Sequence, residues 1–161
     1  MDANLSHPAR EVYRHDRDRF LRCLFIAPAS REAFFCLYAL NLELARIPQM
    51  VSEEMIGHIR YAWWYEAIEK GETKGQPLLE AMKQAQFPRD IALKLAGTYR
   101  DAYPEGTVDP DAAALEYMGV ICPQTVGAWQ RAGRVIGRHR RRHGGGGKGW
   151  LGFKLLISGL Y

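Results

Sequence analysis

The chain has 161 residues, enough for one domain with a hydrophobic core of its own. Its residues are 47% hydrophobic and 25% charged, a globular composition that excludes disordered and fibrous classes. Residues 138–161 contain six basic residues and no acidic one. The formal net charge of the whole chain is +4, so residues 1–137 carry a net charge of −2. The basic excess is therefore confined to the C-terminal end, and the rest of the chain does not indicate nucleic-acid binding.

Cysteine spacing and hydropathy indicate an intracellular protein. Cys23, Cys36 and Cys122 are widely spaced and form no CxxC pair, which disfavours a disulfide framework or a zinc site. Residues 1–20 are polar and lack the apolar segment of a secretory signal. No run approaches the roughly 18 apolar residues of a membrane span. We expect a cytoplasmic protein, soluble or peripheral to a membrane.

The periodicity of apolar residues predicts helices from the N-terminus onward and no strands. The first helix runs from Pro8 to about Ala27, with one apolar stripe on a charged surface. Ser30 is the predicted N-cap of a second helix, which is apolar on most faces and extends to about Arg46. Pro48 is expected to end or kink it, because the residue before a proline disfavours the helical region.

Clear start and stop signals mark the middle of the chain. A third helix is predicted from Ser52, its cap, to Lys70, with Gly71 ending it. A short helix follows over residues 77–86, and Pro88 opens another in the first-turn position that proline favours.

The last predicted helix begins at Asp109-Pro110-Asp111 and continues to about Gly137, with a kink at Pro123. We expect residues 1–137 to form one helical domain that is cut off in mid-helix. Residues 138–161 are basic and rich in glycine, and we expect a disordered tail there, for which a change of reading frame is the simplest origin.

The segment REAFFCLYALNLELARIPQMVSEEMIGHIRYAWWYEAI, residues 31–68, resembles the squalene/phytoene synthase family. The similarity is to the branch with the mitochondrial complex I assembly factors and their bacterial relatives, and it extends more weakly over residues 10–137. The resemblance implies an all-α, isoprenoid (terpenoid) synthase-like helical bundle. Because members of the family are longer, it also implies that this chain corresponds to an N-terminal half, with apolar surface left exposed.

The family's reaction joins two prenyl diphosphates head to head at Mg²⁺ ions, which are held by two aspartate-rich motifs with carboxylates four residues apart. Ala45 and Gln49 occupy the positions of the first motif, and nothing after Gly137 supplies the second. The resemblance therefore predicts no metal ligands and no cofactor.

The resemblance also supplies pocket-lining candidates, which are Arg31, Tyr38, Asn41 and Trp64. Tyr38 and Trp64 would line an apolar cavity suited to an isoprenoid chain, although aromatic residues at helical spacing are more often plain core. Asn41 lies within an apolar helix and needs a buried partner, so it is either a structural anchor or part of a pocket.

Acidic residues near these positions are candidates for chemistry. Glu43 is the candidate catalytic carboxylate, but its spacing from Arg46 also fits an ordinary pair on a helix surface. Asp16 and Asp18 stand near a phosphate-facing segment of the family's enzymes, where carboxylates would repel diphosphate. We expect these two to be solvated or paired with arginine.

Three functions follow from this reading. The first is a catalytically degenerate family member that acts as a binding or assembly factor, holding an isoprenoid, another lipid or a protein partner. The second is an active prenyl-diphosphate transferase that uses Glu43 and Mg²⁺. The third is the binding of nucleic acid or anionic lipid by a basic tail, residues 138–161.

Overall fold

The computed structural model describes residues 4–106, 108–121, 123 and 126–143. The described residues form eight α-helices and no β-strand, which confirms the all-α prediction. The helices are α1 (His7–His15), α2 (Arg17–Cys23), α3 (Pro28–Met50), α4 (Glu54–Lys70), α5 (Pro77–Gln84), α6 (Arg89–Ala102), α7 (Pro110–Ile121) and α8 (Val126–His143).

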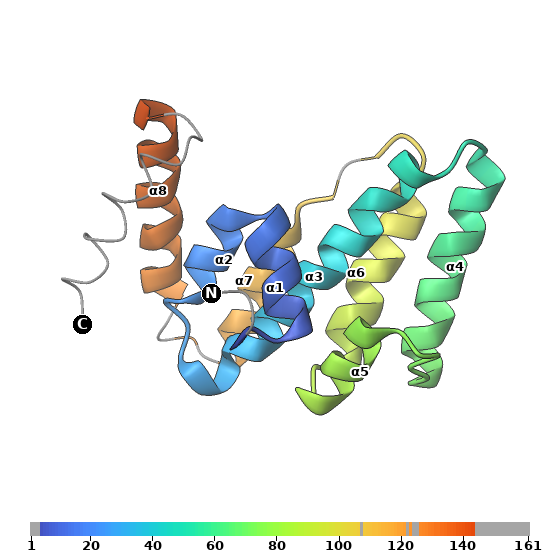
Figure 1. Ribbon diagram of the computed structural model, residues 1–161, viewed down its shortest axis with the longest axis horizontal. Helices are drawn as coiled ribbons and strands as arrows, with labels where there is room; N and C mark the ends of the chain where they lie inside the picture. The colour runs from blue at the N-terminus through green and yellow to red at the C-terminus, as the bar shows by residue number, and fades with distance from the viewer. Residues whose placement is uncertain (1–3, 107, 122, 124–125, 144–161) are drawn as a thin grey trace.

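Helix α3 is the centre of the molecule. It crosses the bundle diagonally and packs against α1, α2, α4, α5, α6 and α7 (Figure 1). Every residue from Ala33 to Asn41 is buried, so this stretch is enclosed on all faces. The apolar composition of this stretch predicted a central helix. Neighbouring helices therefore surround it on all sides instead of covering one apolar stripe.

Helix α3 is longer than predicted at both ends. It begins at Pro28 with Ala27 as N-cap, so Ser30 is not the cap, and it continues through Pro48 to Met50. Pro48 has no N–H to donate to the carbonyl of Leu44 one turn earlier. The hydroxyl of Tyr61 on α4 donates to that carbonyl at 3.1 Å, which explains why the proline does not end the helix.

The first predicted helix is two helices, because Asp16 breaks it. The N–H of Asp16 closes α1 on the carbonyl of Val12, and its side chain then accepts a hydrogen bond from the N–H of Arg19 at 3.0 Å. Asp16 is thus the C-cap of α1 and the N-cap of α2. The break cannot be seen in the sequence pattern, because the buried residues of α2 continue the apolar stripe of α1.

The middle of the chain follows the predicted signals with small shifts. Helix α4 has Glu53 rather than Ser52 as its N-cap, and it ends at Gly71, whose φ of 68° is the left-handed conformation that glycine adopts easily. Helix α5 ends two residues earlier than predicted, and Pro88 is the N-cap of α6 rather than its first residue.

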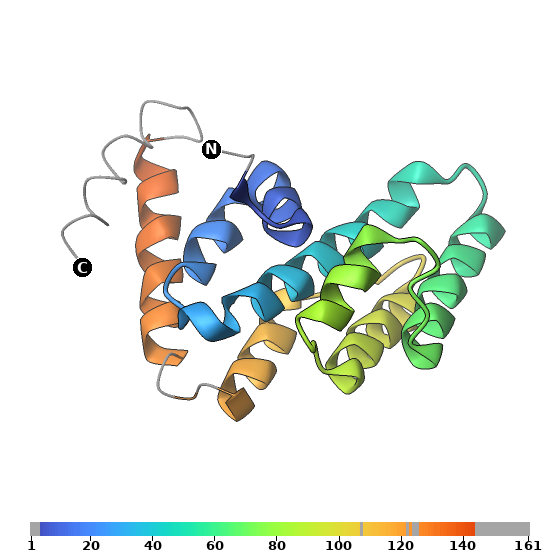
Figure 2. The same cartoon turned by 60° about the horizontal axis from the view of Figure 1, so that its bottom comes forward.

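The C-terminal region differs from the prediction in two ways. The single helix expected after Asp109 is two helices, α7 and α8, on either side of Pro123. Helix α8 continues past the expected boundary at Gly137 to His143, so residues 138–143 are helical and not disordered. Helix α8 lies at one edge of the molecule, against α2 and α7 (Figure 2). Cys122 and the remaining tail, residues 144–161, lie outside the described residues.

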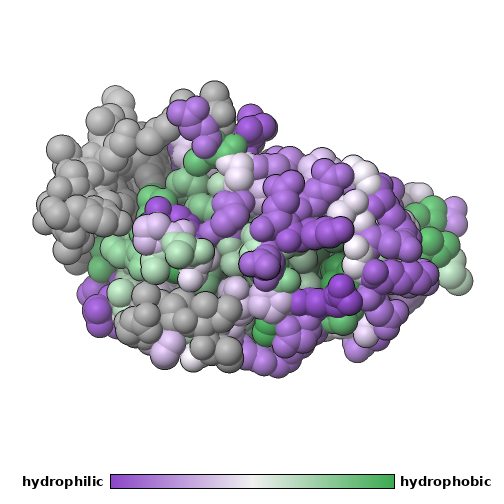
Figure 3. Space-filling view, turned by 90° about the horizontal axis from the view of Figure 1, so that it is seen from below, coloured by the Kyte–Doolittle hydropathy of each residue, from purple (hydrophilic) through white to green (hydrophobic). Residues whose placement is uncertain are grey.

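Large apolar side chains are exposed at the end of the molecule opposite α8. Met50 at the end of α3 and Met55, Ile56 and Ile59 on α4 are 39–66% exposed. A space-filling view from below shows hydrophobic residues at that end (Figure 3). None of the described helices has both the length and the hydropathy to cross a membrane.

Shortening a buried side chain of the central helix should destabilise the fold more than shortening an exposed side chain. Leu40 is fully buried, and we expect Leu40→Ala to lower the free energy of unfolding by about 2–5 kcal/mol through lost burial and a cavity. Met55→Ala, at a side chain that is 66% exposed, should change it by less than about 0.5 kcal/mol. Urea titrations followed by circular dichroism measure both, and equal losses would contradict the central position of α3.

Candidate functional site

The densest set of partly buried charges surrounds the carboxylate of Asp111, where α2, α3 and α7 meet. Asp111 Oδ1 accepts a hydrogen bond from Arg19 Nε at 2.9 Å, and Oδ2 accepts one from Arg22 Nη1 at 2.6 Å. Tyr38 on α3 is fully buried and donates its hydroxyl to Asp111 Oδ1 at 3.3 Å. We name Arg19, Arg22, Tyr38 and Asp111 the Asp111 cluster.

The two arginines hold Asp111 in its ionised form. Burial by itself raises the pKa of this carboxyl, but the hydrogen bonds from Arg19 and Arg22 outweigh burial and leave the pKa below its usual range. Burial likewise opposes the charge of Arg19, while Asp111 and Asp16 more than compensate and raise its pKa. Burial raises the pKa of the Tyr38 hydroxyl well above its usual value, so Tyr38 stays protonated.

Arg22 extends the cluster to α8. Its guanidinium carbon lies 3.6 Å from the ring centroid of Trp129, which is only 1% exposed. A Cβ at position 133 would lie 2.9 Å from Arg22 Nε, so Gly133 provides the room for Arg22 to lie against α8. One arginine of α2 therefore contacts both α7 and α8.

The Asp111 cluster acts as a structural tie that joins α2, α3 and α7 through hydrogen bonds. Its one carboxylate is shared by two guanidinium groups, which leaves it a poor ligand for a divalent cation. Cys23 beside the cluster is no nucleophile, because burial raises the pKa of its thiol far above the usual range. Within the described part of the chain, no group of three or more potential metal-ligating side chains comes together.

Tyr38 and Asn41, two of the predicted pocket residues, point into the protein core. Asn41 is 5% exposed, and its Oδ1 accepts a hydrogen bond from the hydroxyl of Tyr99 on α6 at 2.6 Å. Of the two roles left open for Asn41, this geometry fits the structural anchor. Tyr38 donates its hydroxyl to Asp111 of α7, so hydrogen bonds tie α3 to both α6 and α7.

Arg31 and Trp64 lie apart from these two. Arg31 donates from Nη2 to the carbonyls of Leu24 and Ile26 at 3.0 and 3.1 Å, and so satisfies the turn that follows α2. Trp64 on α4 is 6% exposed and packs edge-to-face on Trp63. The structure therefore does not bring the four pocket candidates together around one cavity.

Glu43 forms the surface pair that its spacing suggested. Its Oε1 accepts a hydrogen bond from Arg46 Nη1 at 3.2 Å, and the same nitrogen lies 3.5 Å from Glu11 Oε2 on α1. Ala45 and Gln49 lie four residues apart in the continuous α3, because Pro48 does not end the helix as expected. The two positions thus share a helix face, but neither carries a carboxylate.

The acids near the predicted phosphate-facing segment are paired with arginine, as expected. Asp16 forms an ion pair with Arg19 on α2. Asp18 accepts a hydrogen bond from Arg140 Nη1 of α8 at 2.8 Å. Both carboxylates therefore have structural partners on the described surface.

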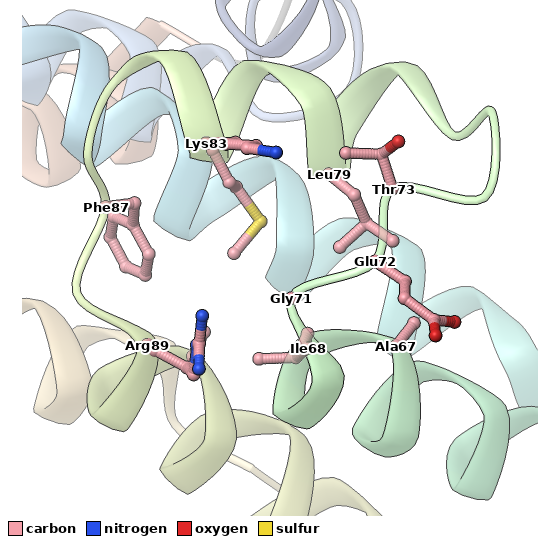
Figure 4. A pocket seen from close by; sticks show the side chains of 11 residues that line it. Ala67, Ile68, Gly71, Glu72, Thr73, Leu79, Lys83, Phe87 and Arg89 are labelled. Atoms are coloured by element: carbon pink, nitrogen blue, oxygen red, sulfur yellow. The ribbon is translucent and has the colours of Figure 1, made fainter.

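A small pocket lies elsewhere, between the C-terminal end of α4, α5 and the start of α6 (Figure 4). Leu79 and Phe87 contribute apolar walls, while Lys83 and Arg89 lie at its edge (Figure 4). Its volume of about 130 Å³ is well below the roughly 300 Å³ or more of sites that enclose drug-sized ligands. None of the four predicted pocket residues lines it.

Sequence reasoning missed Arg19 and Arg22 as parts of the Asp111 cluster, and Trp129 as the ring that Arg22 contacts. The sequence signal is weak, since the pattern predicts Asp111 only as part of a helix start and residues 17–23 only as part of a charged helix with one apolar stripe. Arg22 and Asp111 are 89 residues apart in the chain, and no local pattern pairs residues over that distance.

Comparisons with known proteins agree with the resemblance. A family model described as squalene/phytoene synthase matches residues 12–118. The human protein "NADH dehydrogenase (ubiquinone) complex I, assembly factor 6" is 36% identical over 64 residues. That stretch covers 39% of this chain and only 19% of the human protein. No solved structure matches the chain.

Removing the carboxylate of Asp111 should lower the free energy of unfolding at neutral pH but not at strongly acid pH. Asp111→Asn leaves Arg22 without its charged partner and Arg19 with Asp16 alone, and we expect a loss of about 1–3 kcal/mol at pH 7. Because the folded pKa of Asp111 is depressed, its contribution is complete above the unfolded value of about 3.9 and is lost as pH falls through the folded value. The difference between wild type and variant should therefore vanish at strongly acid pH.

Urea titrations from pH 7 down to acid pH test this expectation. Asp90→Asn is the matched control, because Asp90 occupies the first turn of α6 as Asp111 occupies that of α7. The control should cost only the helix-dipole contribution of about 0.3–1 kcal/mol. A loss at Asp111 that is no larger, or that does not change with pH, would show that the cluster is not a tie.

The hydrogen bond between Tyr99 and Asn41 is open to a double-mutant cycle. Tyr99→Phe leaves the buried amide oxygen without its donor, and we expect a loss of about 1–3 kcal/mol in the free energy of unfolding. Asn41→Leu in the Tyr99→Phe background should recover most of that loss, because both polar partners are then gone. If the two substitutions are simply additive, Asn41 is not an anchor for Tyr99.

Proposed function

Because the chain belongs to the squalene/phytoene synthase family, we propose that it is a member that has lost the metal-dependent condensation of prenyl diphosphates. It acts instead by binding, as an assembly factor for a protein complex. The similarity to a human complex I assembly factor supports this choice over a free-standing lipid carrier, and it makes NADH:ubiquinone oxidoreductase the candidate complex.

Ala45 and Gln49 carry this proposal. They stand where the family's first aspartate-rich motif would be, on one face of a continuous helix that would present two carboxylates well. A methyl group and a neutral amide cannot replace two negative charges at a Mg²⁺–diphosphate complex. Glu43 is bonded to Arg46, which favours a structural role over that of a substitute ligand.

The arrangement of the other family-like residues also supports a binding role. The side chains of Tyr38 and Asn41 are hydrogen-bonded to Asp111 and Tyr99, and Trp64 is buried. The exposed apolar side chains of α4 provide surface for a protein partner. We propose that such a partner, rather than an isoprenoid chain held between these residues, is what the protein binds.

Two measurements test the proposal. Purified protein incubated with farnesyl or geranylgeranyl diphosphate and Mg²⁺ should form no condensation product, and robust product formation would refute the loss of catalysis. Disruption of the gene in its source organism should lower the NADH:ubiquinone oxidoreductase activity of isolated membranes. Activity that is unchanged after disruption would refute the assembly role.

Glu43→Gln separates the proposal from an active transferase built on an atypical carboxylate. The variant should restore oxidoreductase activity to the disrupted strain as well as the wild-type gene does, because the amide keeps the shape of the side chain. Failure of a folded Glu43→Gln variant to complement, together with product formation by the wild type, would instead support the transferase.

A further inference from the structure

The outer face of α8 carries a row of arginines that the proposed function does not use. Arg131, Arg134, Arg138 and Arg141 are all exposed, and their spacing of three, four and three residues places them along one side of the helix. The row is about 15 Å long at the rise of an α-helix. We name these four residues the α8 arginine row.

The opposite side of α8 is anchored to the protein. Trp129 belongs to the main core, and Ala132 and Ile136 pack on Leu21 and Phe25 in the region of α2. Arg140, which lies on a different side from the row, pairs with Asp18. The arginine row therefore lies on the side of α8 away from these contacts. Helix α8 itself lies at the edge of the molecule (Figure 2).

The charges of the row are not balanced locally. Helix α8 contains no acidic residue, and none of the four arginines forms an ion pair or hydrogen bond with another described residue. In contrast, the inward-facing Arg19 and Arg22 both contact Asp111. Four like charges within one helix face repel each other, and an anionic partner would relieve that repulsion.

From this row we infer that α8 docks the protein on the surface of a membrane that contains anionic phospholipid. A row of guanidinium groups can bind several headgroup phosphates that lie in one plane. Val135, 39% exposed between the arginines, fits the boundary between headgroups and acyl chains. The protein would lie on the bilayer through this helix and would not cross it.

A nucleic acid is the competing polyanion, and the structure favours it less. Proteins that bind single strands usually offer aromatic side chains for base stacking, but Trp129 of α8 is only 1% exposed and is covered by Arg22.

Vesicle co-sedimentation with the full chain tests the inference. The protein should bind phosphatidylcholine vesicles that contain phosphatidylserine, bind pure phosphatidylcholine far more weakly, and dissociate as salt is raised. Changing all four arginines of the row to glutamine should weaken binding by at least about 100-fold, since each basic residue at an anionic surface contributes about fivefold. Residues 144–161 stay unchanged in every variant.

A matched control removes the same charge elsewhere. Arg60, Lys70, Lys83 and Arg89 are exposed on other helices or at their ends, and changing these four to glutamine should weaken vesicle binding by no more than about threefold. Changing the four arginines of the row to lysine keeps both the charge and the helix and should retain binding. Circular dichroism confirms that each variant keeps its helical content.

The outcomes separate the alternatives. Equal loss in the row variant and the control, or no binding to anionic vesicles by the wild type, would overturn the inference. Tighter binding to duplex or single-stranded nucleic acid than to vesicles, abolished by the same row variant, would overturn the choice of membrane. Because these assays need neither prenyl diphosphate nor complex I, their failure is independent of the proposed assembly role.

Discussion

Where a helix is buried on every face, its polar groups must be satisfied by its neighbours, and the middle of α3, from Ala33 to Asn41, is buried in this way. Three hydrogen bonds meet this constraint. Tyr38 bonds to Asp111 of α7, Asn41 to Tyr99 of α6, and the carbonyl of Leu44 to Tyr61 of α4. Each bond satisfies a group that would be costly to bury alone, and each also fixes the position of one surrounding helix.

The same constraint bears on function. Tyr38, Asn41 and Trp64 are residues that the family resemblance assigns to an apolar cavity, yet here they complete the core. A catalytic site on the central helix would need polar atoms that remain free for a substrate or its metal ions. Here the polar atoms of Tyr38 and Asn41 are bonded to neighbouring helices, and Arg46 pairs with Glu43. A binding surface on the outside is easier to reconcile with this packing than a cavity within.

The helical architecture could be predicted from sequence because it depends on local patterns. Apolar periodicity located the helices, and Gly71 ended α4 as expected, since its φ of 68° is a local property of glycine. The prediction that Pro48 ends or kinks the helix is wrong, because the group that satisfies the carbonyl left without a donor, the hydroxyl of Tyr61, comes from another helix. The site residues could be chosen one by one, but their partners could not, since Asn41 and Tyr99 lie 58 residues apart.

Arginine shows how burial decides the role of one residue type in this protein. Arg19 and Arg22 have side chains only 26% and 15% exposed, so their charges need a carboxylate within the fold, and Asp111 provides it. The arginines on the outer face of α8 are solvated and need no such partner for the helix to form. Their charges therefore remain available for a partner outside the chain. Because Arg22 also stacks on Trp129, the paired arginines hold in place the helix that presents the unpaired ones. The position of the α8 arginine row thus depends on the core, which links the packing around α3 to the surface on which we expect the protein to bind a membrane.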